Sequence, residues 1–489
     1  MKRKRSVQMF AKAVALASAL MFGNTSSAAD YYWDNDAGAG FGAAGGTWAA
    51  PTLNLWSLDP TGVAAPEASV TTGTSDALHF GTASAGLAEG TITVSGTVSA
   101  NSLTFGSASG AITLSGGTSI TLGGTTPTVT VNNTSNTISS AIKGTADTAG
   151  ITKLGSGTLN FMGVSLFGGD SPLMFTVDGG KLAFTQTGGT INAISGASAG
   201  VTINNASTVA FSRTGTESRF AMRGGAQVIF GATGGNTFDV GNINFLLQST
   251  ANKMTTAGGA RNIIKGQQLN TQGNALNFNV ARGTDESVDL EVQANIASTG
   301  SNMALNKSGN GILALSHTSN PLNAGSSITI SDGTLALIGS GRLGSGSYSG
   351  NITNNAALIY NSTADQALSG VISGTGTLTK TNAGTLTLSG NNTYSGATTI
   401  SVGRLRILTN PGALSPDTAV AVSGDGTSGG QLYFSLAGTY TNNMNISGVG
   451  FVDADALTTK AGAIRFVDTM TLGGTLTLAA DARAGFISG

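Results

Sequence analysis

Apolar residues recur in pairs, two positions apart, along most of the chain. Early pairs are Ile92/Val94, Leu103/Phe105, Ile112/Leu114, Ile120/Leu122 and Val129/Val131. Alternation within a pair is the period of a half-buried β-strand, and the Gly-, Ser- and Asn-rich stretches between pairs are typical of turns. Successive pairs begin 11, 9, 8 and 9 residues apart, which suits a β-sandwich, a barrel or a β-helix. The pattern predicts an all-β protein without choosing among these.

A longer repeat favours stacked units. In three segments a Lys has an apolar residue two positions before it, a Gly four positions after it and apolar residues six and eight positions after it. The Lys, Gly and first following apolar residue are Lys153, Gly157 and Leu159, then Lys307, Gly311 and Leu313, then Lys380, Gly384 and Leu386. A second element of the form Gly-x-Leu follows each copy, as in Gly403 and Leu405 of the third copy. Self-similarity of this kind indicates supersecondary units that stack.

Each unit is too short to bury enough apolar surface alone, so its strands must pair with the units above and below it. The end units then need caps, because an open rung is an unpaired sheet edge. The repeated Lys has the parity of the apolar residue two positions before it. We expect its stem to cover the strand end and its ammonium group to reach water.

The segment from Gly376 to Leu405 resembles the autotransporter-associated β-strand repeat, also called the passenger-associated transport repeat. The copies around Lys153 and Lys307 lack its Gly-Asn-Asn-Thr-Tyr-Ser-Gly stretch, present here at residues 390–396. The resemblance implies a right-handed parallel β-helix in the secreted passenger of a bacterial surface protein, and it brings no catalytic residues. A complete protein of that kind ends in a transmembrane β-barrel. The sequence up to Gly489 shows no barrel pattern, so we expect the chain to be the front part of a longer passenger; the alternative is a repeat protein retained at the surface by another route.

The first residues predict export. A basic head, Lys2 to Arg5, precedes a short apolar run from Ala13 to Phe22, and small residues at positions 27–29 offer a cleavage site. We expect a signal peptide at residues 1–29, cleaved after Ala29. The apolar run is about half the roughly 20 residues that span a bilayer.

Composition narrows the class further. The chain of 489 residues has no cysteine, 73 glycines and 10% charged residues, so disulfides cannot stabilise it. Its 40% apolar content is too high for a disordered chain. A net charge of −1 provides no basic stripe, and we expect no nucleic-acid partner.

Residues 30–80 are predicted to form an N-terminal cap, because all three tryptophans, Trp33, Trp48 and Trp56, lie there. We expect the indoles to cover the first open rung. Stacking of these rings on a glycan is the alternative.

Several short motifs resemble those of nucleotide-binding, catalytic or zinc-binding sites but lack the helix or partner residues that such sites require. Gly339 to Gly344 matches the dinucleotide fingerprint, but no helix is expected after it. The stretch around Ser198 matches a nucleophile elbow, again without a helix. His79 and His317 are the two histidines, each placed in or beside a strand, and we expect no zinc site.

The serious alternative is a polysaccharide lyase or hydrolase built on a β-helix, which needs clustered carboxylates. The densest clusters are Asp285/Glu286/Asp289/Glu291, near Arg282, and Asp453/Asp455. Solvated turns are the usual explanation of such clusters.

The sequence therefore predicts an all-β, right-handed parallel β-helix over residues 81–489, after the signal peptide and the cap. We expect an exported, non-enzymatic stalk or adhesin, displayed on the bacterial cell surface or released from it, without catalytic residues, metal or cofactor. Expected partners are surface glycans or neighbouring cells, and an outer-membrane translocation or anchoring partner.

Overall fold

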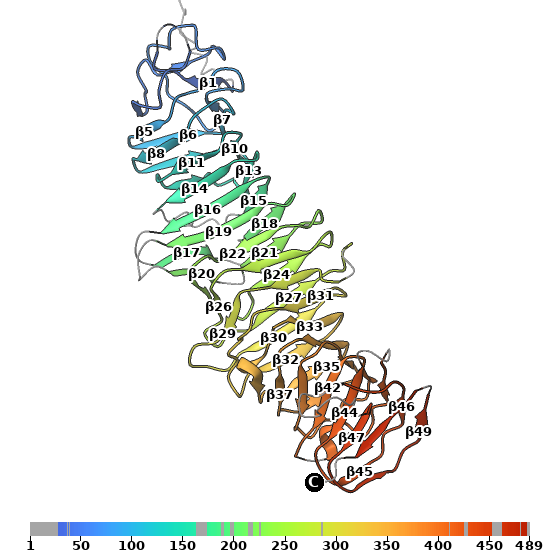
Figure 1. Cartoon of the computed structure of the whole chain (residues 1–489). Helices are drawn as coiled ribbons and strands as arrows, with labels where there is room; N and C mark the ends of the chain where they lie inside the picture. Colours follow the sequence, from blue (N-terminus) through green and yellow to red (C-terminus); the bar gives the residue numbers. More distant parts are fainter. Residues whose placement is uncertain are drawn as a thin grey trace, which may run out of the picture.

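The alternating strands stack into one elongated ladder (Figure 1). The computed structural model describes residues 28–36, 38, 40–162, 174–186, 190–195, 200–213, 219–223, 226–284, 287–409, 411–424, 429–451, 462–479 and 481–486. Residues 1–27 of the predicted signal peptide lie outside this set. Within it, regular structure consists of β-strands and two short 3-10 turns, η1 (Gly344–Gly346) and η2 (Pro411–Ala413). None of the described helices is long and apolar enough to cross a membrane.

As far as Ser373 the chain winds through three sheets in turn, and we call these sheets the first, second and third faces; beyond it most described strands belong to the second and third faces. The first face is a 15-stranded sheet in which, beyond the N-terminal segment, neighbouring strands come from successive coils. Its strands, in spatial order, are β3 (Trp56–Ser57), β1 (Asp30–Trp33), β4 (Ala77–Phe80), β7 (Ser102–Phe105), β10 (Thr128–Val131), β13 (Gly150–Leu154), β15 (Met174–Asp178), β18 (Gly200–Asn204), β21 (Gln227–Phe230), β24 (Lys253–Thr256), β27 (Leu276–Val280), β30 (Ala304–Ser308), β32 (Ser327–Ile330), β35 (Ile352–Asn354) and β38 (Ile372–Ser373).

The second face is a parallel ladder along the whole rod. Its end strands, β2 and β49, each pair with one neighbour among the described residues, so the ladder is open. Its strands are β2 (Thr47–Trp48), β5 (Gly90–Val94), β8 (Ile112–Gly116), β11 (Ser135–Ile138), β14 (Thr158–Met162), β16 (Lys181–Gln186), β19 (Thr208–Arg213), β22 (Thr237–Asp239), β25 (Asn262–Lys265), β28 (Leu290–Val292), β31 (Ile312–Leu315), β33 (Thr334–Gly339), β36 (Ala357–Ser362), β39 (Thr377–Lys380), β41 (Thr398–Ile400), β43 (Val420–Val422), β46 (Met444–Ile446) and β49 (Leu476–Leu478).

The third face is divided into shorter sheets. They comprise β6 (Thr97–Ala100), β9 (Ser119–Leu122) and β12 (Ile142–Gly144); β17 (Thr190–Ser195), β20 (Arg219–Arg223), β23 (Asn244–Leu247), β26 (Gln268–Asn270) and β29 (Asn295–Ala297); and β34 (Ser347–Tyr348), β37 (Gln366–Leu368), β40 (Thr385–Leu388), β42 (Gly403–Ile407), β44 (Gly430–Phe434), β47 (Ile464–Phe466) and β50 (Ala484–Phe486). Near the C-terminal end, β45 (Gly438–Tyr440) pairs with β48 (Met470–Leu472).

The predicted apolar pairs supply the core, and all of their side chains are buried. They cycle through the faces: Leu103/Phe105 lies on the first, Ile112/Leu114 on the second and Ile120/Leu122 on the third. One coil therefore contains about three of the spacings read from the sequence. Register confirms the stacking, because Leu103 pairs with Leu78 of the coil before and Val129 of the coil after.

The prediction of a β-solenoid is confirmed. Coils differ in length: the stretch from Ile352 to its register partner Ile372 is much shorter than the stretch from Phe278 to its partner Lys307. Inside the rod, equivalent side chains pile up, as in the stacked Phe184 and Phe211 rings, 5.1 Å apart. The right-handed sense of the winding stays a prediction.

Candidate functional site

The recurring lysines lie at corners between two faces. Lys153 of β13 and Lys307 of β30 stand on the first face, just before the corner to the second. Lys380 of β39 stands on the second face, just before the corner to the third. All three side chains are fully buried. The repeat therefore marks a kind of corner and is not tied to one face of the rod.

Each buried ammonium group donates three hydrogen bonds to backbone carbonyl oxygens. Two acceptors belong to the corner that follows the lysine, and the third belongs to the next coil. The bonds are Lys153 Nζ to Gly155 O (2.6 Å), Gly157 O (2.6 Å) and Gly179 O (2.7 Å); Lys307 Nζ to Ser308 O (2.9 Å), Gly309 O (2.6 Å) and Asp332 O (3.1 Å); and Lys380 Nζ to Thr381 O (3.1 Å), Asn382 O (2.5 Å) and Val402 O (3.0 Å).

The expectation that these ammonium groups reach water is wrong. The side chains do follow the inward parity of their strands, but the acceptors lie inside the rod. At a corner the backbone leaves the ladder, so its carbonyl groups need other donors. An ammonium group has three donors and no acceptor, which suits a cluster of carbonyls.

The other repeat residues surround the same corners. Leu159, Leu313, Leu386 and Leu405 are buried. The repeat glycines lie against the preceding coil: an added Cβ would come within 1.9 Å of Asn133 O at Gly157, 2.5 Å of Ala281 O at Gly311 and 2.1 Å of Ala364 O at Gly384. At Gly403, which has φ +73°, it would lie 2.2 Å from Asn382 O. Adjacent coils therefore touch backbone to backbone at these corners.

The buried lysines make stability depend on pH. Burial lowers the pKa of Lys153, Lys307 and Lys380 from 10.5 to about 8. Between pH 8 and 10.5 the unfolded chain then binds more protons than the folded chain, so stability rises with pH across this window. Burial raises the pKa of Tyr360 and Tyr394 to about 12, which reverses the trend above pH 10.

We therefore expect the urea midpoint of unfolding to rise from pH 8 to about pH 10 and then fall. The urea midpoint of the Lys307→Met variant should rise less steeply with pH than that of the wild type, because one titrating group is gone. The measurement is urea unfolding followed by circular dichroism from pH 7 to 11. A midpoint that falls steadily from pH 8 to 10 in the wild type contradicts the assignment.

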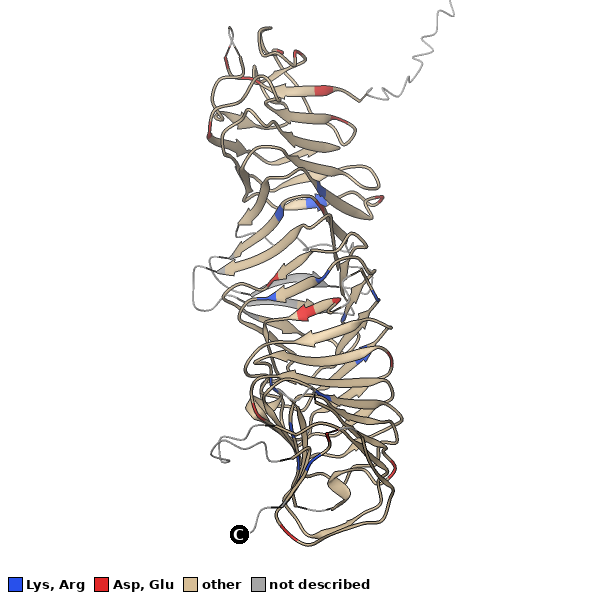
Figure 2. Ribbon diagram, turned by 45° about the vertical axis from the view of Figure 1, so that its right-hand side comes forward, with Lys and Arg blue, Asp and Glu red and all other residues tan. Residues whose placement is uncertain are grey.

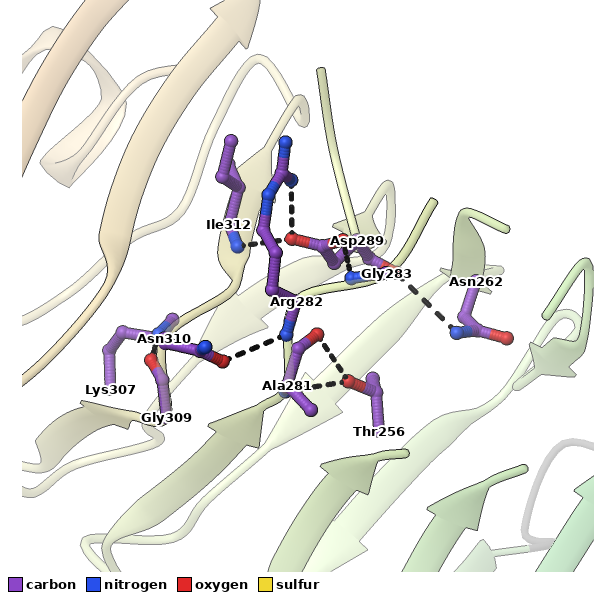
Figure 3. Close-up of polar contacts among 10 residues, drawn as sticks. All are labelled: Thr256, Asn262, Ala281, Arg282, Gly283, Asp289, Lys307, Gly309, Asn310 and Ile312. Carbon is purple, nitrogen blue, oxygen red and sulfur yellow. Dashed lines mark hydrogen bonds and ion pairs between the residues drawn. The ribbon is translucent and has the colours of Figure 1, made fainter. Parts of the chain in front are cut away.

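Asp289, one of the carboxylates considered for an enzyme, is bound by local side-chain and backbone donors (Figure 3). Asp289, which is 2% exposed, accepts hydrogen bonds from Arg282 Nη1 (2.8 Å), Gly283 N (2.7 Å) and Ile312 N (2.6 Å). Since Ile312 belongs to the next coil, Asp289 joins two coils. Its two oxygens carry three donors, so it is poorly placed to exchange a proton with a substrate.

Glu291 is likewise satisfied locally. It accepts hydrogen bonds from Ser316 Oγ (2.7 Å) and Gln293 Nε2 (3.2 Å), and pairs with Arg261 Nη1 at 3.3 Å. Asp285, Glu286, Asp453 and Asp455 lie outside the described residues.

The other sequence motifs have local explanations. His79 Nε2 lies 3.0 Å from Asp30 Oδ1, and His317 Nδ1 accepts a hydrogen bond from Ser319 N at 3.0 Å. After Gly339 the chain continues into the single turn η1 and then β34, so no α-helix follows the dinucleotide-like motif. Residues 196–199, which include the elbow-like Ser198, lie outside the described part of the chain.

The three tryptophans pack together inside the N-terminal end of the rod. All are fully buried. Trp56 lies edge-on to Trp33 (4.9 Å between ring centroids) and to Trp48 (5.8 Å), and 5.9 Å from Phe80. Buried rings present no face to a glycan, so the stacking role considered for them is wrong.

An arginine row on the third face was not expected from the sequence. Arg406 of β42, Tyr433 of β44 and Arg465 of β47 are register partners. The Tyr433 ring centroid lies 5.6 Å from the Arg406 guanidinium, 5.4 Å from that of Arg465 and 4.8 Å from that of Arg404. Charged residues are sparse along the rod (Figure 2), so three guanidinium groups on one ring are unusual here.

The alternation Arg404, Leu405, Arg406 in the second repeat element was the available signal, because it places both arginines outward. The register with Tyr433 and Arg465 was not readable. The connections between these strands have unequal lengths, since the stretch from Arg406 to Tyr433 is shorter than the stretch from Tyr433 to Arg465.

Comparison with known proteins agrees with this architecture. The model of the passenger-associated transport repeat matches residues 305–337 and 378–407. The chain is also 28% identical, over 482 residues, to the adhesin BmaC autotransporter of Brucella suis biovar 1 (strain 1330). That alignment covers 93% of this chain but 13% of the relative, so the chain spans about an eighth of that protein's length. No solved structure is significantly similar to it.

Proposed function

We propose that this chain, which carries passenger-associated transport repeats and is exported to the bacterial cell surface, acts there as a non-enzymatic stalk with an adhesive face. The observation that carries the proposal is the unbroken second-face ladder from β2 to β49. Such a ladder gives length and stiffness by adding coils, each stabilised by its neighbours. Similarity to an autotransporter adhesin supports the adhesive role.

In this proposal the repeat residues join coils. Lys153, Lys307 and Lys380 each tie a corner to the coil after it, and the repeat glycines allow the close approach. These corners carry no chemistry of their own, because a repeated ammonium group bound to carbonyls is not a catalytic base.

We also propose that residues 30–80 cap the rod and that residues 81–489 form the solenoid. β3, the outermost strand of the first face, runs antiparallel to β1, whereas β1 and β4 are parallel. A reversed end strand and buried tryptophans both close the core at this end. β4, the last strand of the proposed cap, already pairs with β7 of the solenoid.

The proposal is tested on the exported chain, residues 30–489. We expect beads coated with it to adhere to host or bacterial cells more than beads coated with a charge-matched inert protein. We also expect no cleavage of a panel of anionic polysaccharides. If the coated beads adhere to none of the cell types tested, the adhesive role is contradicted and the chain is a stalk without an adhesive face. Cleavage that disappears in a folded Asp289→Ala variant establishes the enzyme alternative instead.

A further inference from the structure

A cavity of about 310 Å³ opens on the outward side of the third face, partly within the second segment that matches the family model. Its lining includes Asp365, Thr385, Thr387, Arg404 and Arg406. This volume is at the small end of ligand pockets, which are about 300–1,000 Å³. It suits a single sugar residue or a group of similar size.

Strand register arranges these side chains as a grid. Thr385 pairs with Arg404, and Thr387 pairs with Arg406, on the adjacent strands β40 and β42. Neighbouring strands lie about 4.8 Å apart, and alternate residues on one strand about 6.7 Å apart. Two hydroxyls and two guanidinium groups therefore face solvent across an area close to that of a pyranose ring.

The guanidinium groups are held in position by residues of the next coil. Arg404 Nε–H donates to Gln431 Oε1 and Arg406 Nε–H donates to Ser435 Oγ, both at 2.8 Å. Both groups also lie against the ring of Tyr433. Among the described residues, Arg406 has no other hydrogen bond and no ion pair, so its terminal N–H groups are available. A fixed planar guanidinium binds a carboxylate through two parallel hydrogen bonds with little further loss of side-chain entropy.

The cavity also contains one carboxylate. Asp365 Oδ1 accepts the Thr385 N–H at 2.7 Å, which fixes this group beside the arginines. The lining therefore includes two guanidinium groups and one carboxylate. A bare inorganic anion is attracted by the guanidinium groups but repelled by the Asp365 carboxylate. A sugar acid satisfies both, because its carboxylate accepts from arginine while its hydroxyls donate to Asp365.

We propose that this cavity binds a carboxylate-bearing sugar residue of an acidic glycan. The inference deepens the proposed function, on which it rests, by naming the class of ligand. Uronic acids and sialic acids share this chemistry.

The test is a glycan array probed with the exported chain. It carries oligosaccharides with uronic acid or sialic acid beside the same oligosaccharides with the carboxyl group reduced. We expect about tenfold or greater preference for the carboxylated forms, because a hydrogen bond to a charged group is lost on reduction. Comparing the uronic acid oligosaccharides with the sialic acid oligosaccharides shows which of these two acids the cavity binds.

Arg406→Gln should lower binding of the carboxylated glycan about tenfold or more. Arg406→Lys keeps the charge but loses the two parallel N–H donors, so its affinity should lie between those of the wild type and Arg406→Gln. Lys253→Gln is the control, since Lys253 is an exposed cation on β24 of another face. Thermal unfolding checks that each variant is folded. Equal binding of reduced and carboxylated forms, no binding to either, competition by sulfate as strong as by the glycan, or unchanged binding by Arg406→Gln overturns the proposal.

Cell adherence separates this site from the proposed function. If wild type and Arg406→Gln adhere equally while only the wild type binds the glycan, the site stands and adherence uses another surface. If the chain binds the glycan but adheres to no cell, the adhesive role fails and the site remains.

Discussion

Replacing Lys307 with methionine should lower the protection of the surrounding coils against hydrogen exchange about 100-fold. The ammonium group is the donor for Ser308 O, Gly309 O and Asp332 O inside the rod. Methionine fills similar volume but donates nothing, and each buried unsatisfied group costs about 1–3 kcal/mol. Loss of the buried charge offsets part of this. A net cost of about 3 kcal/mol corresponds to the 100-fold change.

The effect should be local, because each coil contacts mainly its neighbours. Mass spectrometry of exchanging peptides should show the loss in β30, β31 and β32 and little change near β7. The control is Lys253→Met, which removes an exposed lysine from the same face. Unchanged protection in β30 to β32, or equal loss in both variants, shows that the ammonium group does not hold the corner.

The architecture was largely predictable from the sequence because alternation survives in nearly every strand. The pairs from Ile92 to Val131 all lie inward, and the repeats indicated stacking. Which face each pair occupies was not predictable, since one turn separates any two faces. The copy at Lys380 shows why: it has the same local pattern as the copies at Lys153 and Lys307, yet it lies one face further along.

Polar residues were predicted less well than apolar ones. Asn320 and Asn392 stand in polar stretches of a composition typical of turns, but both side chains are buried and join coils. Asn392 Oδ1 accepts from Ile372 N and its Nδ2 donates to Ala413 O, both at 2.7 Å. Sequence patterns treat asparagine and lysine as surface residues. Only the positions of the corner carbonyls and amides reveal that a buried partner is required.

The arginines that line the cavity contact Tyr433, and this arrangement depends on two connections of unequal length, from Arg406 to Tyr433 and from Tyr433 to Arg465. Arg406 meets Tyr433 because the chain between them completes one coil. Composition gives no hint of this, since the chain as a whole has a net charge of −1. Local charge on a solenoid is set by register, and register follows from the length of each coil.

Replacing Gly333, the residue directly before β33, with alanine should disrupt the solenoid around that strand. Gly333 has φ +67°, and an added Cβ would lie 2.4 Å from both Gly309 O and Gly311 O of the preceding coil. Backbone cannot move aside as a flexible side chain does, so the coils must separate. Gly309 O is also an acceptor for Lys307, so the separation weakens the corner.

Gly339, at the other end of β33, is the matched control. It has φ +61°, a comparable backbone conformation, but an added Cβ meets nothing within 4 Å. Gly339→Ala should therefore cost only the conformational strain of about 1 kcal/mol, whereas Gly333→Ala should cost about 1–3 kcal/mol more, because its added methyl group overlaps the preceding coil. Hydrogen exchange in β31, β33 and β36 measures the difference. Gly333→Ala and Lys307→Met both act through Gly309 O. The loss of stability in the double variant should therefore be smaller than the sum of the losses in the two single variants. Similar costs for the two glycine variants, or full additivity of the double variant, would show that adjacent coils are not locked at this corner.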